Sequence, residues 1–419
     1  MDKIEKISLG EQFNLVLINT EKFKTNLISV YIKRPLDRKE VTKNTLIPSL
    51  LESGTVNFKT QREISRKLDE LYGAGLACSV SKKGEKHILS FKLAIVNNTY
   101  VNENILKEGL ILLNEIINKP LVENNGFKKE YLEIEKSNLR DKIRSRINDK
   151  GHYALERCIE EMCKGESFSI YEYGYEEDLK DIDEKTLYDH YKHIIRTSPI
   201  DIVIAGSFDR ESIINDVKNI LNFERDSIIQ IPQEQIDIDV KDVKNITEKM
   251  DVTQGKIVLG FRTNIHYKDD KYYPLMVYSN ILGGGPHSKL FVNVREKESL
   301  CYYIYSSIEK YKSIMVIASG IEVDNYEKAI NLINEQLEKI NKGEITQEEI
   351  SNSKKALINS VNSVKDSLLG LSDFYYGQII SQTQESLDSI IEKINSVTIE
   401  QVIDASSKIK LDTIYFLRN

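Results

Sequence analysis

The sequence of 419 residues has no tryptophan, only seven prolines and only four cysteines. Cys78, Cys158, Cys163 and Cys301 include no C-x-x-C pair, which argues against both a disulfide framework and a zinc-finger spacing. No run approaches the roughly 18 consecutive apolar residues that a membrane-spanning helix needs. The residues before Gly10 include acids and lack the apolar core of a signal peptide. We therefore expect a cytoplasmic protein whose thiols are reduced.

The chain also has no excess of positive charge. The chain has 58 Lys and Arg against 65 Asp and Glu, a formal net charge of -7. Such a chain has no overall basic field to attract nucleic acid or an anionic membrane surface, so we expect neither as a partner. A hydrophobic content of 40% is typical of a globular protein, and 419 residues are too many for one ordinary core.

The apolar pattern of the first half predicts a mixture of strands and helices. Period-two alternation predicts strands over residues 13–18, 26–32, 77–81, 88–95 and 201–206. Apolar residues at spacings of three and four predict helices over 42–51, 60–71, 101–117, 127–165, 184–195 and 209–221. After residue 222 the sequence changes to alternating acidic residues and isoleucines with a proline. This pattern is typical of an extended linker over 223–250.

The second half repeats the first. The predicted strand 256–261 corresponds to 26–32, a helix ending at Gly283 corresponds to one ending at Gly54, and the last strand, 412–417, corresponds to 201–206. The matched positions are separated by roughly 215 to 230 residues, far longer than a solenoid repeat. We therefore predict two copies of one α+β domain, each a mostly antiparallel sheet with helices packed on one face. The domains are 1–222 and 251–419, joined by the linker.

A glycine run, Gly283-Gly284-Gly285, is followed by Pro-His-Ser288-Lys289. A phosphate-binding P-loop needs Gly-Lys-Ser/Thr in that order, whereas here the lysine follows the serine. The dinucleotide pattern fails as well, because Ser288 stands where the third glycine belongs. From the residues alone, the glycines are expected to end one helix with positive φ, and Ser288 to cap the next.

The helix after Ser288 should turn Leu290, Phe291 and Val294 toward a core. Arg295 then lies one turn beyond Phe291, and Tyr302 follows seven residues later, at the start of a predicted strand. The ordinary interpretation of such an arginine is a favourable interaction with the helix dipole, and that of such a tyrosine is half-buried packing.

This stretch resembles the second-half signature of the insulinase/pitrilysin zinc metallopeptidases, which include the mitochondrial processing peptidase and paired bacterial peptidase subunits. The matching positions are Gly284-Gly285, Ser288, Leu290-Phe291, Val294-Arg295-Glu296-Lys297, Leu300 and Tyr302. Further segments similar to the family extend the resemblance to nearly the whole chain: 50–55, 68–84, 172–183 and 202–209.

The resemblance implies two similar α+β domains hinged as a clamshell, with two such chains or halves enclosing a peptide chamber. It also implies that Arg295 and Tyr302 help to hold the peptide backbone and the developing oxyanion, in a site whose zinc comes from the opposing half. Gly283, Gly284, Gly285 and Ser288 would flank the bound peptide. A guanidinium and a phenol hydroxyl are suitable donors for an oxygen that becomes negative.

The chain departs from the family at the metal. Active members carry His-x-x-Glu-His just before the Gly-Thr of the first half, so that two histidines share a zinc and the glutamate activates its water. At that place this chain has Thr45-Leu-Ile-Pro48-Ser49, with none of the three functional residues. The family spacing for the third ligand falls near Ser137, and the neighbouring glutamates are out of register. We therefore expect no metal in this chain.

No other catalytic constellation is supported. Among the six histidines only His190 and His193 could share a helical face, and we expect them to be an exposed surface pair. Cys158 and Cys163 fit no zinc spacing and are expected to be buried thiols. Gly-x-Ser-x-Gly is absent.

The leading hypothesis is a metal-free, non-catalytic subunit of a heterodimeric insulinase-type peptidase. Its partner would be a homologous chain that bears His-x-x-Glu-His and zinc, and this chain would contribute peptide binding and support of the transition state. Alone it should have no peptidase activity. The alternative is a peptide-binding or scaffold pseudo-peptidase with no catalytic role, possibly homodimeric.

Overall fold

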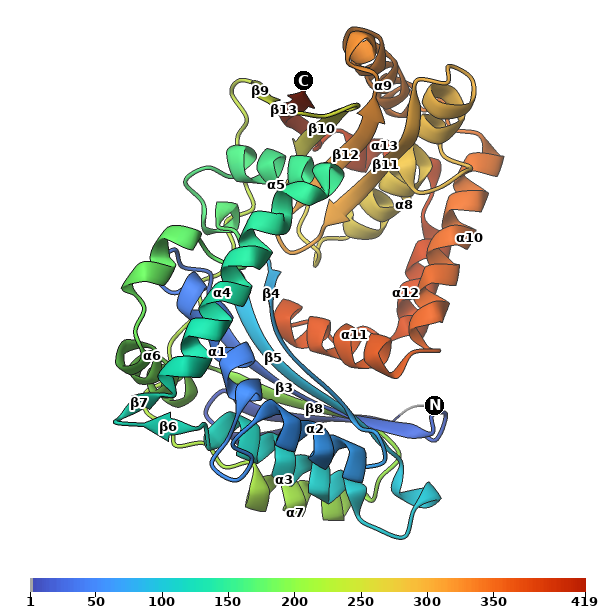
Figure 1. Ribbon diagram of the computed structural model, residues 1–419. Coiled ribbons are helices and arrows are strands. Elements are labelled where there is room, and N and C mark those ends of the chain that lie inside the picture. The colour runs from blue at the N-terminus through green and yellow to red at the C-terminus, as the bar shows by residue number, and fades with distance from the viewer. Residues whose placement is uncertain (1–2) are drawn as a thin grey trace. The chain divides into compact units, whose positions relative to one another are not determined.

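The computed structural model describes residues 3–419 (Figure 1), and the chain divides into two compact units. The first unit consists of the residues up to 144, then 170–232 and 365–377. The second consists of 145–169, 233–364 and 378–419. Each unit therefore contains segments from both halves of the sequence. Within residues 3–419 no helix combines the length and apolar character needed to cross a membrane.

The first unit is built on a six-stranded sheet in the order β1-β2-β8-β3-β5-β4. The strands are β1 (Lys3–Gly10), β2 (Phe13–Asn19), β3 (Thr25–Pro35), β4 (Gly75–Lys83), β5 (Lys86–Val96) and β8 (Ile200–Gly206). All neighbours are antiparallel except β2 and β8, which are parallel. The sheet is mostly antiparallel, as predicted, and β4 is one of its edges.

Helices cover the apolar face of this sheet. They are α1 (Val41–Ser53), α2 (Gln61–Glu70), α3 (Ile105–Asn118), α4 (Lys129–Ser145), α6 (Glu184–Thr197) and α7 (Arg210–Ile220). Alternation along β3 explains the arrangement, because Ile28, Val30 and Ile32 enter the core beneath the helices while Ser29 and Tyr31 point to the other face. A small hairpin, β6 (Val122–Glu123) and β7 (Gly126–Phe127), precedes α4.

The opposite face of the first sheet is covered by a helix from the second half of the chain, α11 (Leu368–Ser381) (Figure 1). Tyr31 stacks on Tyr376 with ring centroids 3.6 Å apart. Asp373 receives a hydrogen bond of 3.1 Å from the Tyr31 hydroxyl and forms a 2.8 Å ion pair with Lys92. Helices were predicted on one face of the sheet only. The structure adds a single helix, α11, on the other face, about 340 residues after β3 in the sequence.

The second unit has a five-stranded sheet in the order β11-β12-β10-β13-β9. Its strands are β9 (Lys244–Lys249), β10 (Gly255–Arg262), β11 (Cys301–Glu309), β12 (Ile314–Ile321) and β13 (Lys410–Arg418). Only β13 and β9 are parallel. Strand β9 lies within the segment predicted to be a linker: its alternating residues suit an edge strand as well as an extended connection.

One face of this sheet packs on α8 (Tyr272–Gly283), α9 (Tyr326–Asn341), α10 (Gln347–Val364), α12 (Leu387–Ser396) and α13 (Ile399–Ser406). The other face packs on α5 (Lys150–Met162), a helix from the first half of the sequence. Alternation in β10 separates the two cores, since Ile257 and Leu259 face the five helices and Val258 faces α5. Cys158 of α5 and Cys163 after it are fully buried, as predicted.

The segment that carries α5 is joined to the second sheet by a buried ionic network. Arg262 of β10, whose side chain is 2% exposed, lies 2.6 Å from Glu166 and 3.0 Å from Asp412. Lys312, fully buried, lies 2.7 Å from the same glutamate. Partial burial of Glu166 acts to raise the pKa of its carboxyl. The hydrogen bonds from Arg262 and Lys312 outweigh this effect and hold the pKa below its ordinary value.

The helix predicted over 127–165 is interrupted, so that part of the prediction is wrong. It consists of α4 and α5, separated by a 3₁₀ turn at Arg146–Asn148. Asp149 ends the interruption, because its carboxylate accepts a 3.0 Å hydrogen bond from the backbone N–H of His152 and caps α5. The break coincides with the passage of the chain from the first unit to the second.

Candidate functional site

The three positions that match the metal motif lie on α1 in the first unit. Thr45 is buried, and its hydroxyl lies 2.9 Å from the carbonyl of Val41 and 3.1 Å from that of Glu172. Pro48 is buried inside the helix, where its ring removes one backbone hydrogen bond. Ser49 is half-buried. Two hydroxyls and a proline offer none of the nitrogen, thiolate or carboxylate ligands that zinc takes in proteins.

The surroundings of α1 do not supply replacement ligands. On α4, the carboxylate of Glu135 accepts a 3.1 Å hydrogen bond from the Ser53 hydroxyl, so a side-chain hydrogen bond joins the two helices there. Burial, and secondarily the Glu52 carboxylate beside it, raises the pKa of the Cys78 thiol, which opposes formation of a thiolate ligand. Among residues 3–419 no three His, Cys, Asp or Glu side chains are grouped to hold a metal ion. The residues present therefore do not fit the zinc that the family resemblance implies.

Two histidines are instead part of the buried structure around α1. Asn44 of α1 donates to Nδ1 of the fully buried His87 at 3.3 Å and accepts from Nε2 of His190 at 2.8 Å. Burial lowers the pKa of His87 to about 4 and that of His190 to about 3, so both rings are neutral. His193 is exposed, but the prediction of a surface pair is wrong for His190. The amphipathic pattern of α6 does not reveal that His190 has a partner, Asn44, that is distant in the sequence.

The glycine run lies in the second unit, at the end of α8. A Cβ atom on Gly283 would lie 2.4 Å from the backbone nitrogen of Ser306, and one on Gly284 would lie 2.3 Å from Nδ2 of Asn280. Asn280 in turn forms a 2.9 Å hydrogen bond with His287. The expectation that these glycines close α8 at positive φ is wrong for Gly284, whose φ is -83°. Close approach of neighbouring groups explains Gly283 and Gly284.

The turn after the glycines has π-helical geometry over Phe291–Glu296. Ser288 is buried, and its hydroxyl accepts from the N–H of Phe291 at 3.4 Å, a long version of the predicted cap. Leu290 and Val294 enter the core as predicted. Lys289 is 7% exposed and lies 2.8 Å from Glu349, so its charge is already matched within the fold.

Arg295 and Tyr302 come together beyond this turn. The guanidinium carbon of Arg295 lies 4.4 Å from the ring centroid of Phe291 and 5.7 Å from that of Tyr302. Tyr302 is 79% exposed, far more than the half-buried position expected for a packing tyrosine. Within residues 3–419 no carboxylate lies in ion-pair range of Arg295, and the residue is only half-buried. The pair thus presents a cation and a phenol at the start of β11.

Strand β11 is the last strand on its side of the second sheet, so its outer edge has no neighbouring strand in the part of the chain that the structure describes. An edge of this kind carries backbone donors and acceptors that an added strand can use. Arg295, Tyr302, Ser288 and the glycines all belong to the second unit. The positions that match the metal motif belong to the first.

Comparison with known proteins identifies the family of this chain. The pattern of the family described as "Peptidase M16 inactive domain" matches residues 181–357. A Bacillus subtilis protein described as "Probable inactive metalloprotease YmfF" is 35% identical over 404 residues, covering 96% of this chain and 95% of its own. This chain belongs to the M16 peptidase family.

Two solved structures confirm the fold. A conserved protein from Enterococcus faecalis V583 superposes with a TM-score of 0.92 at 32% identity, covering 99% of this chain and 98% of its own. A protease from Helicobacter pylori superposes with a TM-score of 0.83 at 17% identity, with both chains fully covered. This M16 protein is therefore a two-unit α+β member of the family, and its α1 has no histidine or acidic residue at positions 45, 48 and 49.

Proposed function

We propose that this M16 protein is a non-catalytic, peptide-binding subunit that acts with a separate M16 chain carrying His-x-x-Glu-His and zinc. The observation that carries the proposal is the difference between the metal-motif positions on α1 and the pair Arg295 and Tyr302. Every matched metal position on α1 is changed, and Thr45 and Pro48 are packed into the fold, whereas Arg295 and Tyr302 keep both their identity and their mutual contact.

The surroundings of Arg295 support a role toward a ligand. An arginine with no carboxylate partner among residues 3–419, flanked by an exposed tyrosine, has donors available for a carbonyl oxygen. The adjoining free edge of β11 supplies the backbone groups that an extended peptide pairs with. Neither feature serves the stability of the unit, since an exposed tyrosine ring contributes little burial.

The test is reconstitution with the M16 chain of the same organism that carries His-x-x-Glu-His. The two purified chains are mixed, and hydrolysis of a quenched fluorescent peptide is measured for each chain alone and for the pair. We expect activity only in the pair, and a loss of about 100-fold in kcat/KM for Arg295→Ala, as is usual when an oxyanion donor is removed. Arg62→Ala, on the exposed surface of α2, is the matched control and should behave as wild type.

Two results would contradict the proposal. Zinc-dependent hydrolysis by this chain alone would show that a metal site exists elsewhere. Unchanged activity of the pair containing Arg295→Ala would remove the contribution to catalysis and favour the scaffold alternative, which a solution mass measurement of the chain alone would then define as monomer or homodimer.

A further inference from the structure

An open pocket with a volume of about 940 Å³ lies entirely within the second unit, on the face of the sheet that α5 covers. It is lined by the start of α5, the turn before β10, and side chains of β10 and β11: Asn148, Asp149, Lys150, Gly151, His152, Asp251, Val252, Thr253, Gln254, Lys256, Tyr303 and Tyr305. Alternation places Lys256 and Tyr303 here, because their neighbours Ile257 and Ile304 belong to the core on the other face.

The floor of the pocket depends on Gly320 of β12, which pairs with Lys256 in the ladder. A Cβ atom on Gly320 would lie 2.9 Å from Cε1 of Tyr303 and 3.1 Å from Nζ of Lys256. The glycine therefore leaves the space in which the ammonium and the phenol ring converge. Tyr303 also stacks on Tyr305, with ring centroids 6.2 Å apart and 27° between the planes.

The lining contains two lysines, Lys150 and Lys256, and two aspartates, Asp149 and Asp251, so its charges balance in number but are not paired. Lys256 is half-buried, and its ammonium has one hydrogen bond, of 2.8 Å, to the neutral Oε1 of Gln254. No carboxylate of residues 3–419 lies within ion-pair distance of it, whereas Asp149 and Asp251 are exposed and therefore hydrated. A partly desolvated cation needs an anionic partner more than a hydrated carboxylate needs a cation. Burial lowers the pKa of Lys256, although the Asp149 carboxylate acts in the opposite direction.

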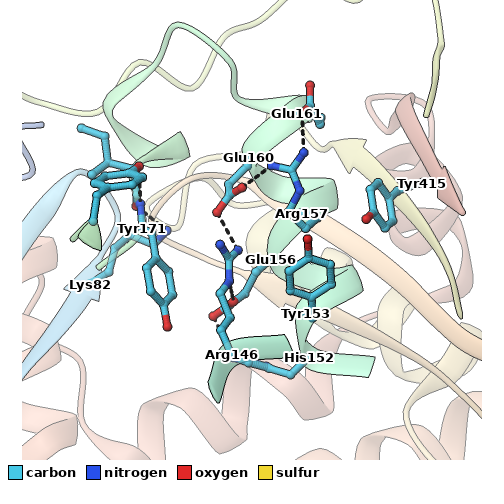
Figure 2. A network of polar contacts seen from close by, with 12 residues as sticks. Lys82, Arg146, His152, Tyr153, Glu156, Arg157, Glu160, Glu161, Tyr171 and Tyr415 are labelled. Carbon is cyan, nitrogen blue, oxygen red and sulfur yellow. Dashed lines mark hydrogen bonds and ion pairs between the residues drawn. The ribbon is translucent and has the colours of Figure 1, made fainter. Parts of the chain in front are cut away.

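The wall above the floor is fixed by ion pairs along α5 (Figure 2). Arg146, in the turn that leads into the pocket, pairs with Glu156 and, at 2.5 Å, with Glu160. Arg157 holds the same Glu160 at 2.5 Å. These ion pairs join the turn before α5 to the helix itself, so part of the pocket wall is held by α5.

We propose that this pocket binds a carboxylate of an extended peptide that lies along β11, with Lys256 as its ion partner and the hydroxyls of Tyr303 and Tyr305 as further donors. The inference rests on the proposed peptide-binding function and names its chemical preference. The carboxylate is either an acidic side chain or the peptide's own C-terminus. Neither tyrosine hydroxyl has a hydrogen-bond acceptor among residues 3–419, so both are available to it.

The test is selection from a positional-scanning library of N-acetylated hexapeptides on the immobilised full-length chain. One half of the library has amidated C-termini and the other half has free ones. We expect enrichment of about tenfold for Glu or Asp at one position of the amidated half, or a similar preference for the free-acid half, as a charged hydrogen bond typically provides. Lys256→Met should abolish the preference.

Lys342→Met is the matched control, because this exposed lysine at the end of α9 lies in the same unit but outside the pocket. It should retain the preference, and the melting temperatures of both variants should match wild type. Selection of basic residues, or a preference for acids that Lys256→Met leaves intact, would overturn the assignment of the pocket while leaving peptide binding in place. Failure of wild type to retain any peptide would overturn the peptide-binding function as well.

Discussion

Tyr31 of β3 lies face to face with Tyr376 of α11, with 3.6 Å between ring centroids and 7° between ring planes. Tyr31 is 2% exposed, and Tyr376 is fully buried. The two residues come from opposite halves of a duplicated sequence, yet they belong to one compact unit. The first sheet therefore depends on the second half of the chain for the cover of one face.

Replacement of Tyr31 by alanine should lower the free energy of unfolding by about 3 kcal/mol, since it deletes a buried aromatic ring and the ring stacking. Tyr31→Phe keeps the stacking and loses the interactions of the hydroxyl, among them the bond to Asp373, so we expect about 1 kcal/mol. Guanidinium unfolding followed by circular dichroism measures both. Tyr100→Ala, at a residue 59% exposed, should change the value by less than about 0.5 kcal/mol. Equal effects of all three substitutions would show that α11 is not fixed to the sheet.

Acid should destabilise the first unit through His87 and His190. Both native pKa values, about 4 and about 3, lie below the ordinary value of 6.5, so between pH 6.5 and 4 the unfolded chain binds more protons than the native one. Stability is therefore retained above pH 6.5 and lost as the pH falls, by about 1.4 kcal/mol per pH unit for each histidine.

Unfolding measured from pH 7.5 to 4.5 in wild type and His190→Gln checks this. The glutamine can still donate to Asn44 but does not titrate, so the pH dependence should become shallower by about one proton. Gln61→Ala, on the exposed start of α2, removes no ionisable group; it is the control and should leave the slope unchanged. A slope in His190→Gln identical to that of wild type would show that His190 is not a neutral buried base.

The ionic network of the second unit predicts a large penalty at Glu166. Glu166→Gln removes the carboxylate that the buried Arg262 and Lys312 share, which should cost about 3 to 5 kcal/mol. Thermal unfolding should show a correspondingly lower transition temperature. Glu176→Gln breaks an exposed pair with Arg144 and should leave the transition temperature close to that of wild type. If Glu166→Gln is as stable as the exposed variant, the network contributes nothing to the attachment of α5.

Gly283→Ala should strain the contact between α8 and β11, because the added methyl group would lie 2.4 Å from a backbone atom of Ser306. We expect a loss of about 1 to 3 kcal/mol, as for other overpacked positions, detectable in the same unfolding assay. Gly75→Ala on β4 is the control, since no atom lies within 4 Å of the place that its methyl group would take. A neutral Gly283→Ala would mean that β11 adjusts freely to α8.

Much of the fold follows from the sequence because its signals are local. Strand β10 alternates cleanly, and α2 and α13 begin with capping boxes, Thr60 with Glu63 and Thr398 with Gln401, that their sequences spell out. The placement of α5 and α11 is not determined locally, because each helix packs on the sheet formed mainly by the other half of the chain. Apolar periodicity shows that a helix has a face to bury, but it does not identify the sheet that receives it.

The choice of Arg295 and Tyr302 as site residues rests on a family signature and stays a prediction. Their mutual contact, the high exposure of Tyr302 and the π-helical turn were not predicted. The pocket around Lys256 was missed, because its wall comes from residues 148–152, about 100 positions earlier in the chain. The tyrosines at 302, 303 and 305 were the one available signal, since three tyrosines on an edge strand exceed what packing requires.

The exchanged helix α11 also fixes the order of events during synthesis. Residues 365–377 leave the ribosome only after about nine-tenths of the 419 residues have been made, and until then the Tyr31 face of the first sheet has no cover. An N-terminal half in that state exposes an incomplete surface. The first unit can therefore finish folding only after residue 377 has been translated, long after its own sheet strands have been made.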